Sequence, residues 1–206
     1  MSRTPQFHQG QILDAAARLV ARHGPSGATI GAIAQAVGAP TGSIYHRFNS
    51  RDALLAEVWL DAATAFQTAF FERLAGPAPR EAGLVAALYM AQRVREHPRE
   101  ARVLLLHRRE DFVDRGWPAN MRRQAEQLGR QVETELRAFS GRLCGRQDAR
   151  TVRSITYAVV EAPFGAVRRY VAAEESPPPY VDGLIRVTYE AVIRQLGVSR
   201  KERSTT

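Results

Sequence analysis

Apolar residues recur at helical spacing along almost the whole chain, and this periodicity restricts the fold more than any other feature. Ile12, Ala16 and Val20 stand four residues apart, so they share one face of a first helix. Strand-type alternation is absent from the sequence, and Gly and Pro stand mainly where periodic segments stop. The sequence therefore predicts an all-α protein.

The first fifty residues contain three short helical segments with clear start and stop signals. Gly24-Pro25 is expected to end the first. Thr29 is expected to cap the second, which ends at Gly38, because glycine suits the left-handed position after a helix. The third runs from about Pro40 to Phe48, with Pro40 in its first turn.

Longer helical segments follow, each bounded by capping residues or by proline. Either Asn49 or Ser50 is expected to cap the fourth helix, and Asp148 to cap one that reaches about Ala173. In that helix Pro163 should produce a kink and free a backbone carbonyl. The other segments are expected to begin near residues 81, 101, 118 and 180, the second of them ending near Arg109 and the last near Leu196.

Charge and cysteine content narrow the class of protein. The 206 residues carry a formal net charge of +8, which favours a nucleic-acid partner, although 28 of the 29 basic residues are arginine and this bias can reflect base composition. Residues 1–51 hold five arginines and one aspartate, a local balance of +4. A single cysteine, Cys144, excludes an intramolecular disulfide. The sequence lacks an apolar signal segment and a membrane-length apolar run, so we expect a cytoplasmic protein without a membrane partner.

The second and third segments are separated only by Gly38-Ala39, the short glycine-containing turn that a helix-turn-helix requires. In the third segment Ile44 and Phe48 are spaced to enter a small core. The remaining side chains stay on the outer face, where a recognition helix meets the major groove of DNA. These outer residues donate readily to phosphates and base edges: Thr41, Gly42, Ser43, Tyr45, His46 and Arg47.

The segment TIGAIAQAVGAPTGSIYHRFNSRDALL resembles the N-terminal helix-turn-helix of the TetR family, over roughly residues 10 to 60. The positions that carry the resemblance are Thr29, Ile33-Ala34, Gly38, Gly42-Ser43-Ile44-Tyr45, Phe48, Arg51 and Leu54. Pro40 stands where the family often has Ser or Thr, and Gly31 where it often has a polar or basic residue.

The resemblance implies DNA contacts and a division into domains. Thr41 and Ser43 would meet bases or phosphates, and Arg47 would reach either the DNA backbone or solvent. The other implied contacts are to phosphates, from Tyr45, His46, Thr29 and Arg51. The implied domains are a helix-turn-helix domain at 1–50, a helical effector-binding and dimerisation domain at 51–199 and a polar tail at 200–206.

The resemblance also implies a homodimer on a palindromic double-stranded DNA operator, paired through residues 148–173 and 180–197. Candidate interface residues are Ile155, Val159, Phe164, Val167, Leu184, Val187 and Ala191. The alternative is that these residues form the internal core of a monomer.

A small-molecule effector is expected among the helices between about 60 and 170. Candidate contacts, each of which could instead be an ordinary core residue, are Trp59, Phe66, Tyr89, Met90, His107, Trp117, Tyr157, Glu161 and Phe164. Glu161 lies in the apolar stretch AVVEAPFGAV, where it binds the polar end of a ligand, pairs with an arginine or is exposed.

The expected function is a ligand-responsive transcriptional regulator, most simply a repressor that a small molecule releases from its operator. Alternatives are an activator, a ligand-independent architectural DNA binder and an all-helical enzyme. The sequence contains no metal-ligand spacing, nucleotide-binding loop or catalytic Ser/His/Asp order, so we expect no cofactor, metal or catalytic residue.

Overall fold

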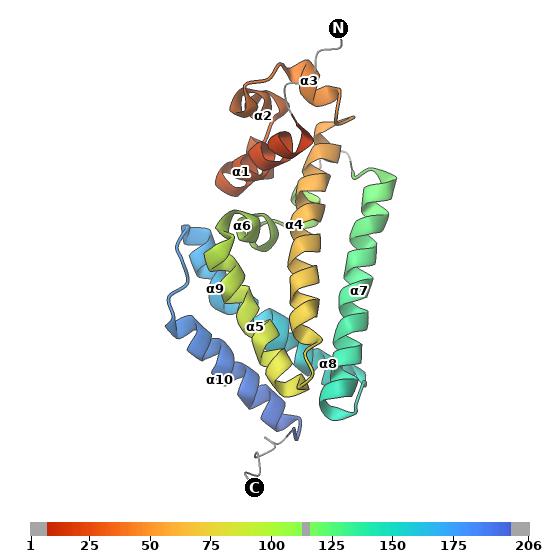
Figure 1. Cartoon of the computed structure of the whole chain (residues 1–206), viewed down its shortest axis with the longest axis vertical. Helices are drawn as coiled ribbons and strands as arrows, with labels where there is room; N and C mark the ends of the chain where they lie inside the picture. Colours follow the sequence, from red (N-terminus) through yellow and green to blue (C-terminus); the bar gives the residue numbers. More distant parts are fainter. Residues whose placement is uncertain (1–7, 113–115, 199–206) are drawn as a thin grey trace. The chain divides into compact units, whose positions relative to one another are not determined.

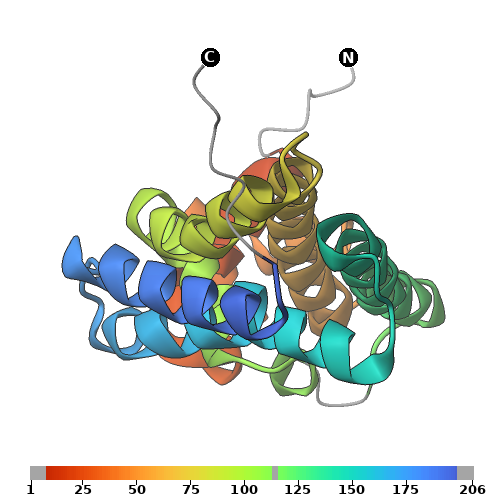
Figure 2. The same cartoon turned by 90° about the horizontal axis from the view of Figure 1, so that it is seen from below.

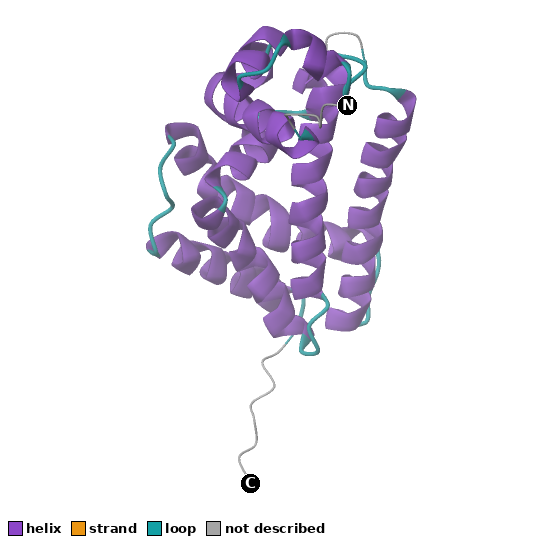
Figure 3. Cartoon of the chain, turned by 45° about the horizontal axis from the view of Figure 1, so that its top comes forward, coloured by secondary structure: helices purple, strands orange, loops and turns teal. Residues whose placement is uncertain are grey.

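The computed structural model describes residues 8–112 and 116–198, and within these ranges it contains helices and loops but no strand (Figure 3). This confirms the predicted all-α class. In chain order the elements are α1 (Gln9–Gly27), α2 (Ile30–Val37), α3 (Thr41–Tyr45), α4 (Arg51–Leu74), α5 (Pro79–Glu96), α6 (Pro98–Leu106), the 3-10 turn η1 (Arg109–Phe112), α7 (Ala119–Cys144), α8 (Ala149–Thr156), the π-helical segment η2 (Tyr157–Glu161), α9 (Ala162–Ala173) and α10 (Tyr180–Gln195) (Figure 1).

The chain divides into two compact units. The first comprises residues 1–66 and 97–129, and the second comprises residues 67–96 and 130–206. Helices α4 and α7 each contribute one segment to the first unit and one segment to the second. These units are defined by how compactly the chain packs, whereas the predicted boundary after residue 50 separates two functions. The functional boundary stays a prediction.

Local capping signals in the first unit lie where the sequence predicts them. Gly24 leaves the helical conformation with φ 72°, and Gly38 ends α2 in the left-handed region with φ 75°. The Thr29 hydroxyl accepts a hydrogen bond from the backbone N–H of Ala32 at 3.1 Å. Ser50, rather than Asn49, caps α4 by accepting from the N–H of Ala53.

Two predicted helix boundaries near prolines were wrong. Pro40 precedes the first turn of α3 as its N-cap, with the extended ψ of 144°. Helix α6 begins at Pro98, three residues before the predicted start, because proline fits the first helical turn. It ends at Leu106 instead of near Arg109, and the backbone N–H of Arg108 then donates to the carboxylate of Asp111 at 2.7 Å.

The first unit has a continuous apolar core. Helix α1 contributes Ile12, Ala16 and Val20, the face that the spacing predicts, and α6 packs on α1 with Val103. Ile44 and Phe48 enter this core from the recognition segment and are 0% and 3% exposed, as predicted. The short helices α2 and α3 therefore depend on tertiary packing for their stability.

In the second unit α5, α9 and α10 pack against one another (Figure 2). The centre of this packing is a close approach at Gly83 of α5. A Cβ atom at this position would lie 2.7 Å from the ring of Phe139 and would overlap the phenol of Tyr189. The Tyr189 hydroxyl donates to the carbonyl of Arg80 at 2.8 Å, so glycine is needed here for space.

The helix changes its hydrogen-bond pattern just before Pro163, while the predicted kink and freed carbonyl stay predictions. Proline has no N–H to donate, and the helix adapts over η2, where the N–H of Ala162 donates to the carbonyl of Tyr157, five residues earlier. Helices α8, η2 and α9 follow one another without a loop. The wider π-helical turn thus accommodates a proline, which has no N–H group to donate.

Several arginines hold helix ends within the second unit. Arg142 donates to the carbonyl of Leu74 at 2.6 Å, at the end of α4. Arg95 makes a two-pronged contact with Asp182 and also donates to the carbonyl of Pro177. Arg80 pairs with Glu190 and donates to the carbonyl of Val198. These roles use the planar guanidinium fork, so part of the arginine excess is structural.

Candidate nucleic-acid interface

The predicted recognition segment presents its polar side chains to solvent. Tyr45 is 54% exposed, and Thr41, Gly42 and His46 are also exposed. A phenol exposed to this extent beside a buried Ile44 is unusual for a residue with only a packing role. The segment therefore has an apolar side in the core and a hydrogen-bonding side that is free to meet DNA.

The residues around this surface differ in how many of their hydrogen-bonding groups already have a partner within the protein. Thr29 is exposed at the start of α2, and its hydroxyl, which accepts from Ala32, keeps a proton to donate. Ser43 and Arg47 are half-buried, and the guanidinium of Arg47 donates to the backbone carbonyl of Ser43 at 3.3 Å. A phosphate contact from Arg47 would require this side chain to turn outward.

Arg51 opens α4 and is half-buried. Its Nε donates to the carbonyl of Ala28 at 3.1 Å, and its terminal nitrogen donates to the carbonyl of Pro25. Pro25 lies in the last turn of α1 and Ala28 directly follows that helix, so this side chain ties α4 to the start of the helix-turn-helix. The geometry favours a positioning role for Arg51 over the phosphate contact that the family resemblance implies.

The arrangement of α1 to α4 matches a known family of regulators. The model for bacterial regulatory proteins of the tetR family matches residues 12–58. Residues 12–58 thus carry the helix-turn-helix of the tetR family. The matched residues include α2, α3 and the glycine turn between them, so this helix-turn-helix corresponds to the DNA-binding element of that family.

Solved structures extend the similarity of the fold to nearly the whole regulator. A TetR-like regulator from Rhodococcus sp. RHA1 has 18% identity and a TM-score of 0.69, covering 96% of this chain and 100% of the other. The fatty acid degradation regulator FadR from Bacillus halodurans has 18% identity and a TM-score of 0.67, with coverage of 94% and 97%. FadR from Bacillus subtilis, solved with stearoyl-CoA, has 16% identity and a TM-score of 0.64, with coverage of 93% and 98%. Comparison with curated proteins gave no match.

Four of the predicted effector contacts, Trp59, Phe66, His107 and Trp117, lie in the first unit outside α2 and α3. Trp59 and Trp117 meet edge to face, with ring centroids 5.5 Å apart. Trp117 is only 8% exposed, and its indole N–H has no hydrogen-bond partner among the described residues. The ring of His107 contacts Phe112, and burial lowers the pKa of its imidazole.

The other candidates do not form one cluster. Phe66 is half-buried at the end of the α4 segment that belongs to the first unit. Tyr89 and Met90 are buried in α5, with the guanidinium of Arg73 4.0 Å from the centre of the Tyr89 ring. The remaining three lie along η2 and α9, where Tyr157 is exposed and Phe164 and Glu161 are half-buried.

Glu161 does not face a closed apolar interior. Its carboxylate accepts a hydrogen bond from Arg153 at 2.6 Å, and 37% of its side chain is exposed. Of the three roles left open by the sequence, an ion pair with an arginine is the one present. The pair joins residues eight apart, across the π-helical segment η2.

Apart from the half-buried Phe164, the candidate dimer residues separate into two groups. Ile155, Val159 and Val167 are completely buried within the protomer, so their role is in its internal core. Those on α10 face outward, with Leu184 55% and Val187 68% exposed and Ala191 also exposed. Burial in the folded chain thus removes the first group from any surface that a partner can contact.

Within residues 8–112 and 116–198, no group of three or more His, Cys, Asp or Glu side chains could hold a metal ion. No helix in these ranges is both long and apolar enough to cross a bilayer.

The sequence analysis did not single out Arg102, whose Nε donates to the carbonyl of Ala21. No local pattern links residues so far apart in the chain.

Proposed function

We propose that this TetR-family regulator is a repressor that binds a palindromic operator as a homodimer and leaves it when a small molecule binds. The observation that carries the proposal is the outer face of α3, where Tyr45 and Thr41 are exposed while Ile44 is fully buried. This face supplies donors for phosphates and base edges from a rigidly seated helix. The proposal includes no enzymatic activity.

Dimer formation is supported by the outward face of α10. Tyr180, Leu184, Val187 and Ala191 follow one another at helical spacing, and all are exposed in the protomer. Tyr157 of η2 is 47% exposed as well. Large apolar side chains clustered on a surface mark an interaction site, and a second copy presenting the same face would cover them.

Effector binding is supported by the Trp59–Trp117 pair. A buried indole N–H without an acceptor costs free energy, and a ligand with a carbonyl or carboxylate oxygen would supply that acceptor. The aromatic faces would hold its apolar part. Since FadR from Bacillus subtilis was solved with stearoyl-CoA, acyl-CoA thioesters are the first compounds to test.

The proposed switch requires an effector that prefers the conformation unable to bind the operator. A coupling free energy of about 1–3 kcal/mol changes operator affinity roughly 5- to 150-fold. The change would alter the spacing of the two recognition helices in the dimer, because half-sites about one DNA turn apart tolerate little misplacement.

The test is a titration of the purified protein with the DNA beside its own gene at two salt concentrations. Thr41→Ala and Tyr45→Phe are expected to weaken specific binding, whereas Thr134→Ala removes an exposed hydroxyl from α7 and should leave it unchanged. Selection of sites from random DNA follows if that fragment fails. Absence of any preferred site in both experiments would refute the proposal, and a ligand that strengthens binding would refute release by the effector.

A further inference from the structure

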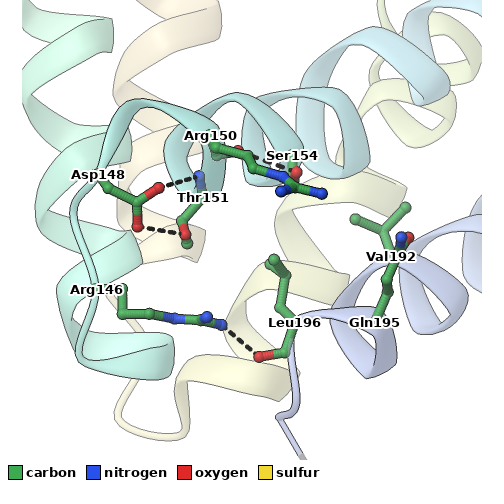
Figure 4. A pocket seen from close by; sticks show the side chains of 8 residues that line it. All are labelled: Arg146, Asp148, Arg150, Thr151, Ser154, Val192, Gln195 and Leu196. Atoms are coloured by element: carbon green, nitrogen blue, oxygen red, sulfur yellow. Dashed lines mark hydrogen bonds between the residues drawn. The ribbon is translucent and has the colours of Figure 1, made fainter.

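The second unit contains a cavity of about 240 Å³ between the first turn of α8 and the last turn of α10 (Figure 4). None of its lining residues belongs to the predicted DNA or effector contacts. Eight residues line it: Arg146, Asp148, Arg150, Thr151, Ser154, Val192, Gln195 and Leu196. The cavity is smaller than the range of about 300–1,000 Å³ that is typical for drug-sized ligands, so it suits a small compound.

Two guanidinium groups and one carboxylate set the charge of the cavity. Asp148 accepts from the backbone N–H of Thr151 at 3.0 Å and from its hydroxyl at 2.6 Å. These hydrogen bonds, the hydroxyl first, lower the pKa of the Asp148 carboxyl, which is therefore ionised at neutral pH. With Arg146 and Arg150 both positive, the formal charge of the lining is +1.

The two arginines are not equally engaged. Arg146 uses one terminal nitrogen to donate to the carbonyl of Leu196, which leaves its other N–H groups available. The guanidinium of Arg150 has no hydrogen-bond or ion-pair partner among the described residues. Figure 4 shows the two side chains on opposite sides of the cavity, with Thr151 between them. An anion placed there would receive donors from both sides.

The remaining wall is partly apolar. Val192 and Leu196 contribute branched side chains from α10, and both are half-buried. Gln195 adds an amide that can both donate and accept. Ser154 already donates its hydroxyl proton to the carbonyl of Arg150, so it can only accept from a ligand. A bare inorganic ion would leave the apolar wall uncovered.

We propose that this cavity binds a small organic monoanion, a short-chain carboxylate whose charged end lies between Arg146 and Arg150 and whose alkyl group contacts Val192 and Leu196. Arginine suits this role because its planar donors match the geometry of a carboxylate. The bound anion would join α8 to α10. All lining residues except Arg146 lie in the segments 148–173 and 180–197 that the family resemblance assigns to the dimer, and none belongs to the Trp59–Trp117 effector site.

The test is calorimetric titration of the full chain with sodium butyrate, sodium acetate and inorganic phosphate at constant ionic strength. Butyrate is expected to bind saturably at one site per chain and more tightly than acetate or phosphate. Arg150→Gln should weaken butyrate binding about tenfold or more, because a charge-assisted hydrogen bond is lost. Arg123→Gln is the matched control, since it removes the same charge from the exposed surface of α7 outside the cavity.

A second variant tests the apolar wall. Val192→Thr keeps the shape of the side chain, and it should reduce the preference for butyrate over acetate without abolishing carboxylate binding. Thermal unfolding of each unliganded variant establishes that it is folded. The proposal is overturned if butyrate does not bind saturably, if phosphate binds as tightly as butyrate, or if Arg123→Gln weakens binding as much as Arg150→Gln.

Discussion

Arg102 of α6 donates from its Nε to the backbone carbonyl of Ala21, 2.6 Å away in the last regular turn of α1. Helix α1 leaves its helical conformation at Gly24, so the carbonyls of this turn lack their usual partners within the helix. The arginine satisfies one of them. It thereby connects the first helix of the DNA-binding region to α6, a contact between segments 81 residues apart.

Replacing Arg102 with methionine should lower the free energy of unfolding by about 1–2 kcal/mol, because a charge-assisted hydrogen bond to a partly buried carbonyl is lost. Chemical denaturation measures this change. Arg99→Met removes an exposed arginine from the same helix and should have little effect. Equal stabilities of the two variants would show that the contact with Ala21 contributes nothing.

The two roles considered for Arg51 give opposite results for Arg51→Lys. If the side chain positions α4, lysine cannot hold the carbonyls of both Ala28 and Pro25, and stability should fall by about 1 kcal/mol. If instead the side chain contacts phosphate, Arg51→Lys keeps the charge and should preserve DNA affinity. Arg51→Gln removes the charge, and it should reduce the salt dependence of DNA affinity by the equivalent of about one phosphate contact. Unfolding and DNA titrations at several salt concentrations distinguish the two roles, and we expect the first.

Gly83→Ala should destabilise the protein by about 1–3 kcal/mol through overpacking against Phe139 and Tyr189. Adding Tyr189→Phe should recover part of this loss, since it removes the hydroxyl that the new methyl group meets. Gly129→Ala is the matched control on the exposed side of α7, where a Cβ atom meets nothing within 4 Å. There alanine should stabilise the helix by up to about 1 kcal/mol, whereas a stabilised Gly83→Ala would contradict the close packing.

Acid should weaken the first unit through His107. Burial lowers the pKa of this imidazole below its ordinary value of 6.5, with a smaller opposing effect of Asp111. The folded state thus favours the neutral form of His107. The contribution of this form to stability is complete above the pKa of the histidine in the unfolded chain, and it is lost as the pH falls through the lower pKa of the folded state. Melting temperatures measured on either side of pH 6.5 should fall less on acidification for His107→Gln than for the parent protein. An identical pH profile would exclude this histidine as a source of acid sensitivity.

Val187→Glu should convert the proposed dimer into a monomer, because it places a charge in the middle of the apolar face of α10. Sedimentation velocity measures the change. Arg186→Glu alters the neighbouring exposed residue and serves as a control for charge. A parent protein that is monomeric, or a Val187→Glu variant that stays dimeric, would place the interface elsewhere or exclude it.

Helix ends and the recognition segment could be predicted because their signals are local. Thr29, Gly38 and Asp148 act on backbone groups within a few residues, and each caps or ends a helix as predicted. Ile44 and Phe48 could be assigned to the core because four-residue spacing defines a helix face. By contrast, the predicted dimer face included Ile155 and Val159, which are buried in the protomer, since periodicity shows that a face is apolar and not what covers it.

By itself, the sequence determined the all-α class, the helix-turn-helix and its polar outer face, because capping, turn formation and helical periodicity all operate over a few residues. Only the tertiary structure decided which partners the charged groups find. Arg102 reaches Ala21, Arg142 reaches the end of α4, and Glu161 pairs with Arg153 instead of entering an apolar interior. The cavity beside Arg150 likewise exists only because α8 and α10 pack together. Such contacts depend on how helices distant in sequence approach one another, which short-range spacing does not encode.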